Sequence, residues 1–222
     1  MSMQATPDNL VVGEPAAITA SVDGDDSPRP ATAAMFGPFA SASAATCTGS
    51  PIGATTTTVT GDGSYTLPPL APSAGGYYAW RVTVDANATS LPVTACGAVT
   101  KVLARPATTI TLLAATAHKD DYVQVGVTVS GLPFPDAIQG TVTLFGPYVS
   151  EAAARADDCR MKAGGPVAFS RTQGNGTFSS PTIQIPGDGP FYAWGATISS
   201  GDLWLSSYSP CAAPGTLMAV SP

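Results

Sequence analysis

The sequence predicts an all-β protein made of two β-sandwich domains in tandem, and three observations carry this prediction. A strand motif and its surrounding landmarks occur twice in the same order, which indicates one supersecondary plan used in two copies. Glycine (23 residues) and proline (21 residues) separate short alternating runs, a pattern typical of turn-rich all-β chains. Four cysteines fall two to each copy at equivalent places. The 222 residues therefore divide into a first domain over 1–105 and a second over 106–222.

The repeated motif reads Gly-Tyr-Tyr-Ala-Trp over residues 76–80 and Pro-Phe-Tyr-Ala-Trp over residues 190–194. Each copy continues into an alternating tail, and period-two alternation places every second side chain on one face of a strand. The face that carries the tryptophan continues with apolar residues, so it should meet the core. On this basis we expect four core residues: Tyr78, Trp80, Tyr192 and Trp194.

In the first half, turn residues set the limits of the predicted strands. Gly13 ends the first strand, Pro38 breaks the third because proline cannot donate to a sheet ladder, and Asp62-Gly63 supplies a hairpin turn. The segment Ala104-Arg105-Pro106 is the predicted joint between the domains. The strands expected in this half span residues 10–12, 16–22, 32–36, 52–60, 64–67, 77–84 and 98–103.

The second half follows the same order, with Asn175-Gly176 as its hairpin signal. Its one helix-prone stretch covers residues 150–156, where Ser150 can cap one or two turns. The strands expected here span residues 109–114, 122–129, 139–145, 167–173, 177–185, 192–198 and 217–220.

The cysteines predict one disulfide in each copy. Four cysteines allow three pairings, and only the symmetry of the repeats favours Cys47–Cys96 and Cys159–Cys211. The alternatives are four buried free thiols or a zinc site, and zinc is disfavoured because Cys-x-x-Cys is missing and His118 is the only histidine.

Disulfides form in oxidising compartments, so the predicted bridges imply an exported, extracellular or cell-surface protein. Residues 1–20 show no charged-then-apolar signal segment. We therefore interpret the chain as a fragment or the mature portion of an exported protein.

The net charge of −6 argues against a nucleic-acid partner, which needs a basic surface, and against binding to an anionic membrane. No apolar run approaches the roughly 18 to 20 residues that span a bilayer. We expect a monomer with no cofactor, no nucleic-acid partner and no membrane insertion in this segment.

Candidate sites are few. No Ser-His-Asp arrangement or pair of catalytic carboxylates is recognisable, so we predict that the chain is not an enzyme. The run Asp23-Gly24-Asp25-Asp26 either supplies oxygen ligands to calcium or forms a solvated turn. Trp204 either contacts a ligand or packs beneath its own loop.

The strand over 77–84 resembles the tyrosine corner of immunoglobulin-like sandwiches, with Tyr78 in the tyrosine place and Trp80 where antibody domains carry their second cysteine. This resemblance implies two tandem immunoglobulin-like sandwiches. Cys47 lies between predicted strands and Cys96 just before the last one. The bridge is therefore expected to tie loops at one end of the domain rather than to pin sheet to sheet.

A closer resemblance rests on Phe-Gly-Pro-Phe, Gly-Asp-Gly-Ser-Tyr, Gly-Tyr-Tyr-Ala-Trp and Cys-Gly, taken in that order. This set resembles tandem repeats in surface-anchored, adhesin-like proteins of Gram-positive actinobacteria. The resemblance implies a stalk module whose partners are neighbouring repeats of a longer surface protein. The alternative is an adhesin-type module that recognises a carbohydrate or protein ligand through loops near Trp204. A hydrolase is the third class, and it requires distant carboxylates to converge.

Overall fold

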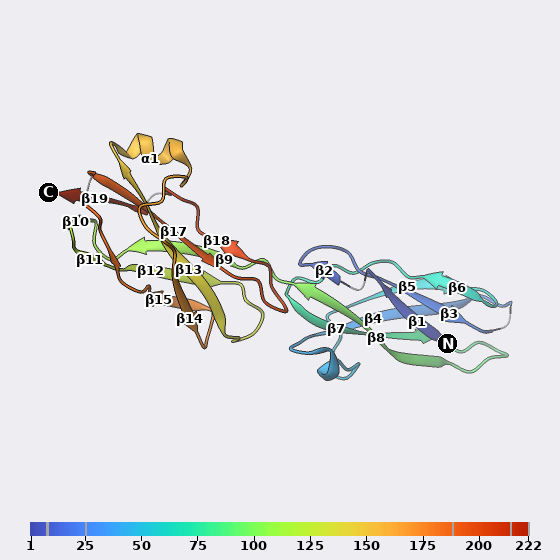
Figure 1. The fold of residues 1–222 in the computed structure, drawn as a ribbon. Coiled ribbons are helices and arrows are strands. Elements are labelled where there is room, and N and C mark those ends of the chain that lie inside the picture. The colour runs from blue at the N-terminus through green and yellow to red at the C-terminus, as the bar shows by residue number, and fades with distance from the viewer. Residues whose placement is uncertain (8, 25, 188, 214, 222) are drawn as a thin grey trace. The chain divides into compact units, whose positions relative to one another are not determined.

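The computed structural model describes residues 1–7, 9–24, 26–187, 189–213 and 215–221. The chain forms two compact units, Met1–Ala104 and Arg105–Pro222, so the division falls inside the predicted joint and one residue before the predicted domain boundary. Strands dominate both units in Figure 1.

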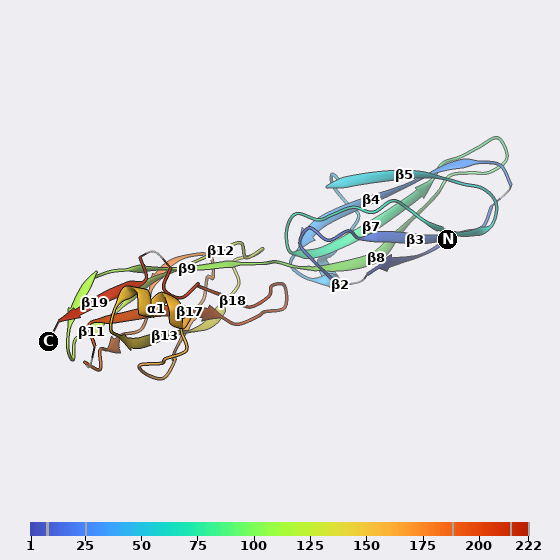
Figure 2. The same cartoon turned by 90° about the horizontal axis from the view of Figure 1, so that it is seen from above.

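The first unit is a sandwich of two described sheets. One sheet has the strand order β1-β3-β6, and the other has the order β2-β8-β7-β4-β5, which can be followed in Figure 2. A short 3-10 turn over Ala42–Ala44 follows β4, with Ser41 as its N-cap. The strands are β1 (Ser2–Thr6), β2 (Asn9–Val11), β3 (Ala17–Val22), β4 (Arg29–Phe39), β5 (Gly53–Val59), β6 (Gly63–Thr66), β7 (Gly76–Val84) and β8 (Val93–Leu103).

The start of the chain forms two strands, β1 and β2, and the sequence predicted only the second of them. Strand β1 was not predicted, because its sequence Ser-Met-Gln-Ala-Thr shows little alternation, yet it pairs antiparallel with β3. The next strand, β2, pairs parallel with β8 in the other sheet. The first residues of the chain therefore contribute an edge strand to each sheet.

The predicted break at Pro38 is wrong. Strand β4 continues to Phe39, and its pairing with β7 shifts register between Phe36 and Phe39. A bulge of this kind takes the proline out of the hydrogen-bonded ladder and lets the strand continue. The second unit repeats the feature, with a shift between Phe145 and Tyr148.

The hairpin predicted at Asp62-Gly63 is also wrong. Strand β5 pairs with β4, whereas β6 pairs with β3 in the opposite sheet. The turn therefore carries the chain from one sheet to the other. The same crossing occurs at Asn175-Gly176, between β14 (Val167–Arg171) and β15 (Gly176–Ser179).

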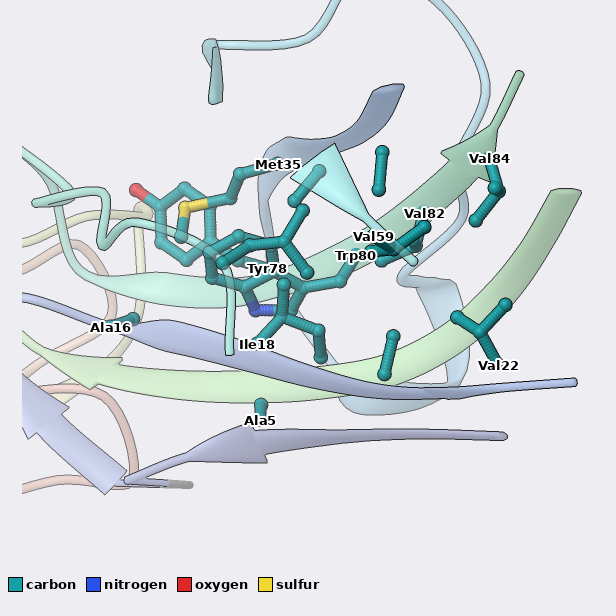
Figure 3. Packing of buried hydrophobic residues seen from close by; sticks show 14 of the residues in the cluster. Ala5, Ala16, Ile18, Val22, Met35, Val59, Tyr78, Trp80, Val82 and Val84 are labelled. Carbon is teal, nitrogen blue, oxygen red and sulfur yellow. The ribbon is translucent and has the colours of Figure 1, made fainter. Parts of the chain in front are cut away.

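The core of the first unit lies between its two sheets and centres on β7. Figure 3 shows the packing of Tyr78, Trp80, Val82 and Val84 against residues of the facing sheet such as Ile18. Trp80 is fully buried and Tyr78 is 1% exposed, so the predicted inward face of this strand is confirmed.

The second unit has more strands, described as three sheets. One has the order β10-β19-β17-β13-β14 with β18 paired to β17, the second is β15-β12-β9, and the third is β11-β16. The parallel pair β2–β8 of the first unit has its counterpart in β10 and β19. The remaining elements are β9 (Ala107–Leu112), β10 (Thr116–His118), β11 (Tyr122–Val123), β12 (Val125–Ser130), β13 (Ile138–Tyr148), α1 (Glu151–Asp157), β16 (Ile183–Gln184), β17 (Phe191–Ile198), β18 (Ser207–Tyr208) and β19 (Leu217–Ser221).

The predicted strands over 122–129 and 177–185 are each divided in two. Strand β11 pairs with β16, whereas β12 pairs with β9 and β15. The two predicted strands are therefore interrupted at adjacent positions, between β11 and β12 and between β15 and β16. Ser180 holds this point, because its Oγ accepts from the Val125 amide at 3.0 Å and its carbonyl accepts from Gln124 Nε2 at 2.8 Å. The predicted helix is confirmed as α1, whose N-cap Ser150 accepts from the Ala153 amide at 3.1 Å.

Candidate functional site

Each unit carries its own disulfide. Cys47 is bonded to Cys96 with a Cα–Cα distance of 6.1 Å, and Cys159 is bonded to Cys211 with a Cα–Cα distance of 5.7 Å. Both distances lie within the ordinary range for disulfides. Closing loops of about 50 residues is worth roughly 4 kcal/mol to each unit in the chain-entropy model.

The position predicted for Cys96 is wrong. Cys96 lies inside β8, which begins at Val93 and pairs Cys96 with Arg81 of β7. A bulge follows at once, since Trp80 pairs with Ala98 and Gly97 is skipped in the register. This bulge interrupts the alternation, so the strand is not recognisable upstream of the cysteine.

Neither disulfide connects the two sheets of its sandwich. In the first unit, Cys47 follows β4 and Cys96 lies in β8, and both strands belong to the same sheet. In the second unit, Cys159 follows α1 and Cys211 precedes β19, again beside one sheet. Because Cys96 is paired with Arg81, on the face opposite Trp80, the first bridge lies over the outside of the sheet.

A tyrosine and a tryptophan fix the inner face of β7. Tyr78 donates its hydroxyl hydrogen to the carbonyl of Ala74, four residues upstream, at 2.8 Å. Burial raises the pKa of Tyr78 to about 12, although this hydrogen bond acts in the opposite direction. Trp80 Nε1 donates to Thr100 Oγ1 at 2.9 Å, so this buried indole N–H is satisfied inside the core.

The second unit keeps both aromatic residues but changes their partners. Tyr192 and Trp194 are fully buried. Met218 stands opposite Tyr192, where Thr100 stands opposite Tyr78, and Trp194 Nε1 has no hydrogen-bond partner among the described residues. The residue four positions before Tyr192 is Asp188, which lies outside the described residues.

Trp204 packs beneath its own loop. The side chain is 7% exposed, and its Nε1 donates to the Ser199 carbonyl at 3.0 Å. The Gly201 amide donates to the Trp204 carbonyl at 3.1 Å, and the indole ring covers Gly201. A side chain held in this way has little surface left for a ligand, whereas Tyr208, in the strand β18 that follows this loop, is 73% exposed.

The acidic turn predicted as a calcium candidate includes Asp25, which lies outside the described residues. Near it, the Gly24 amide donates to Asp62 Oδ1 at 2.7 Å. Within residues 1–7, 9–24, 26–187, 189–213 and 215–221, no three histidine, cysteine or acidic side chains form a group suited to a metal ion.

The helix α1 is anchored beside the second disulfide. Asp157 Oδ2 accepts from the amides of Met161 (2.9 Å) and Arg160 (3.0 Å) and from the Tyr148 hydroxyl (2.9 Å). These hydrogen bonds lower the pKa of the Asp157 carboxyl; the bond from the Met161 amide has the largest effect, followed by the bond from the Tyr148 hydroxyl. Burial, together with this ionised neighbour, raises the pKa of Tyr148. These bonds fix the position of Asp158 and Cys159, which follow directly.

A hollow of about 410 Å³ opens next to this disulfide, on the outer side of the sheet formed by β13 and β17. Gly195 of β17 lies in its lining, and we call it the Gly195 hollow. Its other lining residues are Thr143, Phe145, Asp158, Cys159, Ala196, Thr197, Tyr208, Ser209 and Cys211. The sequence prediction missed this site. The signal available was the contrast between Arg81 and Gly195, the residues that follow the equivalent tryptophans.

Comparisons with known proteins bear on the fold. No model of a known protein family matches the sequence, and no curated protein matches it. Among solved structures, the Escherichia coli adhesin FdeC is similar over 100% of this chain and 64% of its own, with 15% identity and a TM-score of 0.50. The four N-terminal Ig domains of Dscam1 isoform 6.9 are similar over 96% of this chain and 43% of theirs, with 10% identity and a TM-score of 0.34.

Both units are immunoglobulin-like β-sandwiches. The tyrosine corner on β7 and the two-sheet core agree with this fold, and the chain spans 64% of the FdeC chain that it matches. In these immunoglobulin-like units a core tryptophan stands two residues after the corner tyrosine. The disulfide of the first unit does not join the two sheets; it connects two segments of the same sheet.

The described residues include one α-helix, α1, and one 3-10 turn. Neither is long and apolar enough to cross a bilayer.

Proposed function

We propose that the chain is an exported, non-enzymatic structural module of a bacterial cell-surface protein, acting as a stalk or spacer segment. One observation carries the proposal: the same sandwich occurs twice, and each copy is closed by its own disulfide. A spacer needs repeated, stable units rather than a reactive centre. The actinobacterial kinship is part of this proposal and rests on the sequence motifs.

Two further observations support a surface role. Disulfides are formed and kept in oxidising compartments, outside the cytosol of most bacteria. The fold is similar to that of an E. coli adhesin.

The export proposal is tested by trapping thiols in the source cells. Intact cells are treated with an alkylating reagent before lysis, and the chain is then mapped by mass spectrometry without reduction. We expect Cys47–Cys96 and Cys159–Cys211 as linked peptides in the envelope or extracellular fraction. Four alkylated cysteines in a cytosolic fraction would overturn the proposal.

An adhesin-type binding module is the second candidate, and the Gly195 hollow favours it. Strand β18 follows the loop that buries Trp204 and contributes Tyr208 to this hollow, so a ligand here would bind near that loop, as the sequence predicts. A screen against glycans and matrix proteins tests this candidate. A ligand that binds the wild type and is lost in Tyr208→Ala would establish binding, and Tyr122→Ala is the matched control because Tyr122 is a similarly exposed tyrosine.

A further inference from the structure

The two units differ at the residue that follows the core tryptophan on the outer face of the sheet. In the first unit this residue is Arg81, and its guanidinium carbon lies 4.6 Å from the centroid of the Phe36 ring. Its Nη1 also donates to the carbonyl of Cys47 at 3.4 Å. An arginine side chain of the unit itself therefore covers the space between an aromatic ring and the disulfide.

In the second unit the equivalent residue is Gly195, which has no side chain to cover that space. Register identifies the equivalence, because Phe36 pairs with Ala79 and Phe145 pairs with Ala193, two residues before Arg81 and Gly195. Phe36 is 1% exposed, whereas Phe145 is half-buried and lines the Gly195 hollow. The hollow is therefore lined by an aromatic ring and a disulfide, as the equivalent place in the first unit is, but it has no guanidinium among its described lining residues.

The rim of the hollow adds groups that suit a cation. Asp158 lines it at the end of α1, and Tyr208 of β18 contributes a second aromatic side chain. Hydroxyls come from Thr143, Thr197 and Ser209. A guanidinium stacks on aromatic faces and forms paired hydrogen bonds with a carboxylate, so this lining is complementary to it.

Two arginines of the second unit lie near the hollow, Arg155 and Arg160, and neither is among the described residues that line it. Arg155 donates to the Ala212 carbonyl at 2.9 Å, next to the disulfide, and its Nη2 lies 3.5 Å from Glu151 Oε2. The net charge of −6 also favours the approach of a cationic partner to the chain.

We propose that the Gly195 hollow binds an arginine side chain presented by a partner protein, in the place that Arg81 occupies in the first unit. This inference deepens the binding-module candidate by naming the group that is bound, and it does not depend on the stalk role. The partner is defined by its chemistry, namely an exposed arginine on a segment that can reach the outer face of the β13–β17 sheet.

The test is a titration of the full ¹⁵N-labelled chain with the capped tripeptide Gly-Arg-Gly, followed by NMR, with Gly-Lys-Gly as the control peptide. We expect saturable shifts of amides around the hollow, including Gly195 and Tyr208, and no comparable shifts around Arg81. The lysine peptide should bind more weakly, because an ammonium cannot form the paired bonds of a guanidinium.

Three variants sharpen the test. Asp158→Asn removes the carboxylate charge and should weaken binding about tenfold, the loss expected for one charge-assisted hydrogen bond. Asp85→Asn, at an exposed position of the first unit, makes the same change in net charge and should leave binding unchanged. Gly195→Arg should abolish binding by supplying the guanidinium from within. Its Cβ would lie 2.9 Å from Phe145 Cε2, so the ring must move, and Asp158→Asn decides the matter if this variant misfolds.

Several outcomes would overturn the inference. Equal responses to the arginine and lysine peptides would show unspecific charge attraction. Saturable shifts of the same amides with a neutral disaccharide such as lactose, and none with the arginine peptide, would assign the hollow to a carbohydrate. A lack of shifts at the hollow with either probe would contradict a ligand site there, while the export proposal would keep its separate test.

Discussion

The buried pair formed by Trp80 and Thr100 offers a sharp test of how the core is organised. Trp80 Nε1 donates to Thr100 Oγ1 at 2.9 Å, and both side chains are fully buried. Thr100→Val keeps the shape of the side chain but replaces the acceptor oxygen with a methyl group. The indole N–H then lies in the core without a partner, because water cannot reach it.

A buried donor left unsatisfied costs about 1–3 kcal/mol. For a unit of this size, 1 kcal/mol corresponds to a shift of about 4–8 °C in Tm. We therefore expect Thr100→Val to lower the melting temperature of the first unit by about 4–24 °C in calorimetry of the whole chain. The second unit serves as an internal reference, because Met218 already replaces this threonine there.

A double-mutant cycle with Trp80→Phe separates this hydrogen bond from packing. In the Trp80→Phe background no N–H remains to be satisfied, so Thr100→Val should cost much less than in the wild type. An equal cost in both backgrounds, or no cost in the wild type, would refute the reasoning.

The other predictions concern the core, the corner tyrosine and the bridges. Trp80→Ala and Trp194→Ala should each cost about 3–5 kcal/mol of unfolding free energy in chemical denaturation, and near-wild-type stability would contradict their place in the core. Stability of the first unit should fall from about pH 10 to about pH 12, because the unfolded phenol loses its proton near pH 10 while the pKa of Tyr78 is about 12. Tyr78→Phe should remove this part of the pH dependence, and an unchanged alkaline profile would count against it. In single-molecule pulling, reduction should lengthen each unfolding step by roughly 160–190 Å, since the bridges enclose sequence separations of 49 and 52 residues. Steps of the same length before and after reduction would mean that the bridges do not close these loops.

The sequence predicted those parts of the fold that depend on local alternation of apolar and polar residues or on the symmetry of the repeat. The inward face of β7 follows from period-two alternation, and the symmetry of the two copies selected the disulfide pairing that the structure contains. Ser150 marked the start of α1 because its cap is a local interaction.

What the sequence did not reveal depends on contacts between distant segments. The turn at Asp62-Gly63 looks like a hairpin, but only the pairing of β6 with β3 decides that the chain changes sheets there. Strand β1 has little pattern of its own and is held by its pairing with β3. The Gly195 hollow required a three-dimensional comparison, because it arises where a side chain is missing beside the Phe145 ring and the disulfide.

The most direct test of the proposed role is antibody labelling of intact source cells. An antibody raised against this chain is applied to unpermeabilised cells and, in parallel, to lysed cells. An exported module of a surface protein predicts strong labelling of intact cells, removed by brief treatment with an external protease. Labelling that appears only after lysis, and that survives the protease, would contradict the account.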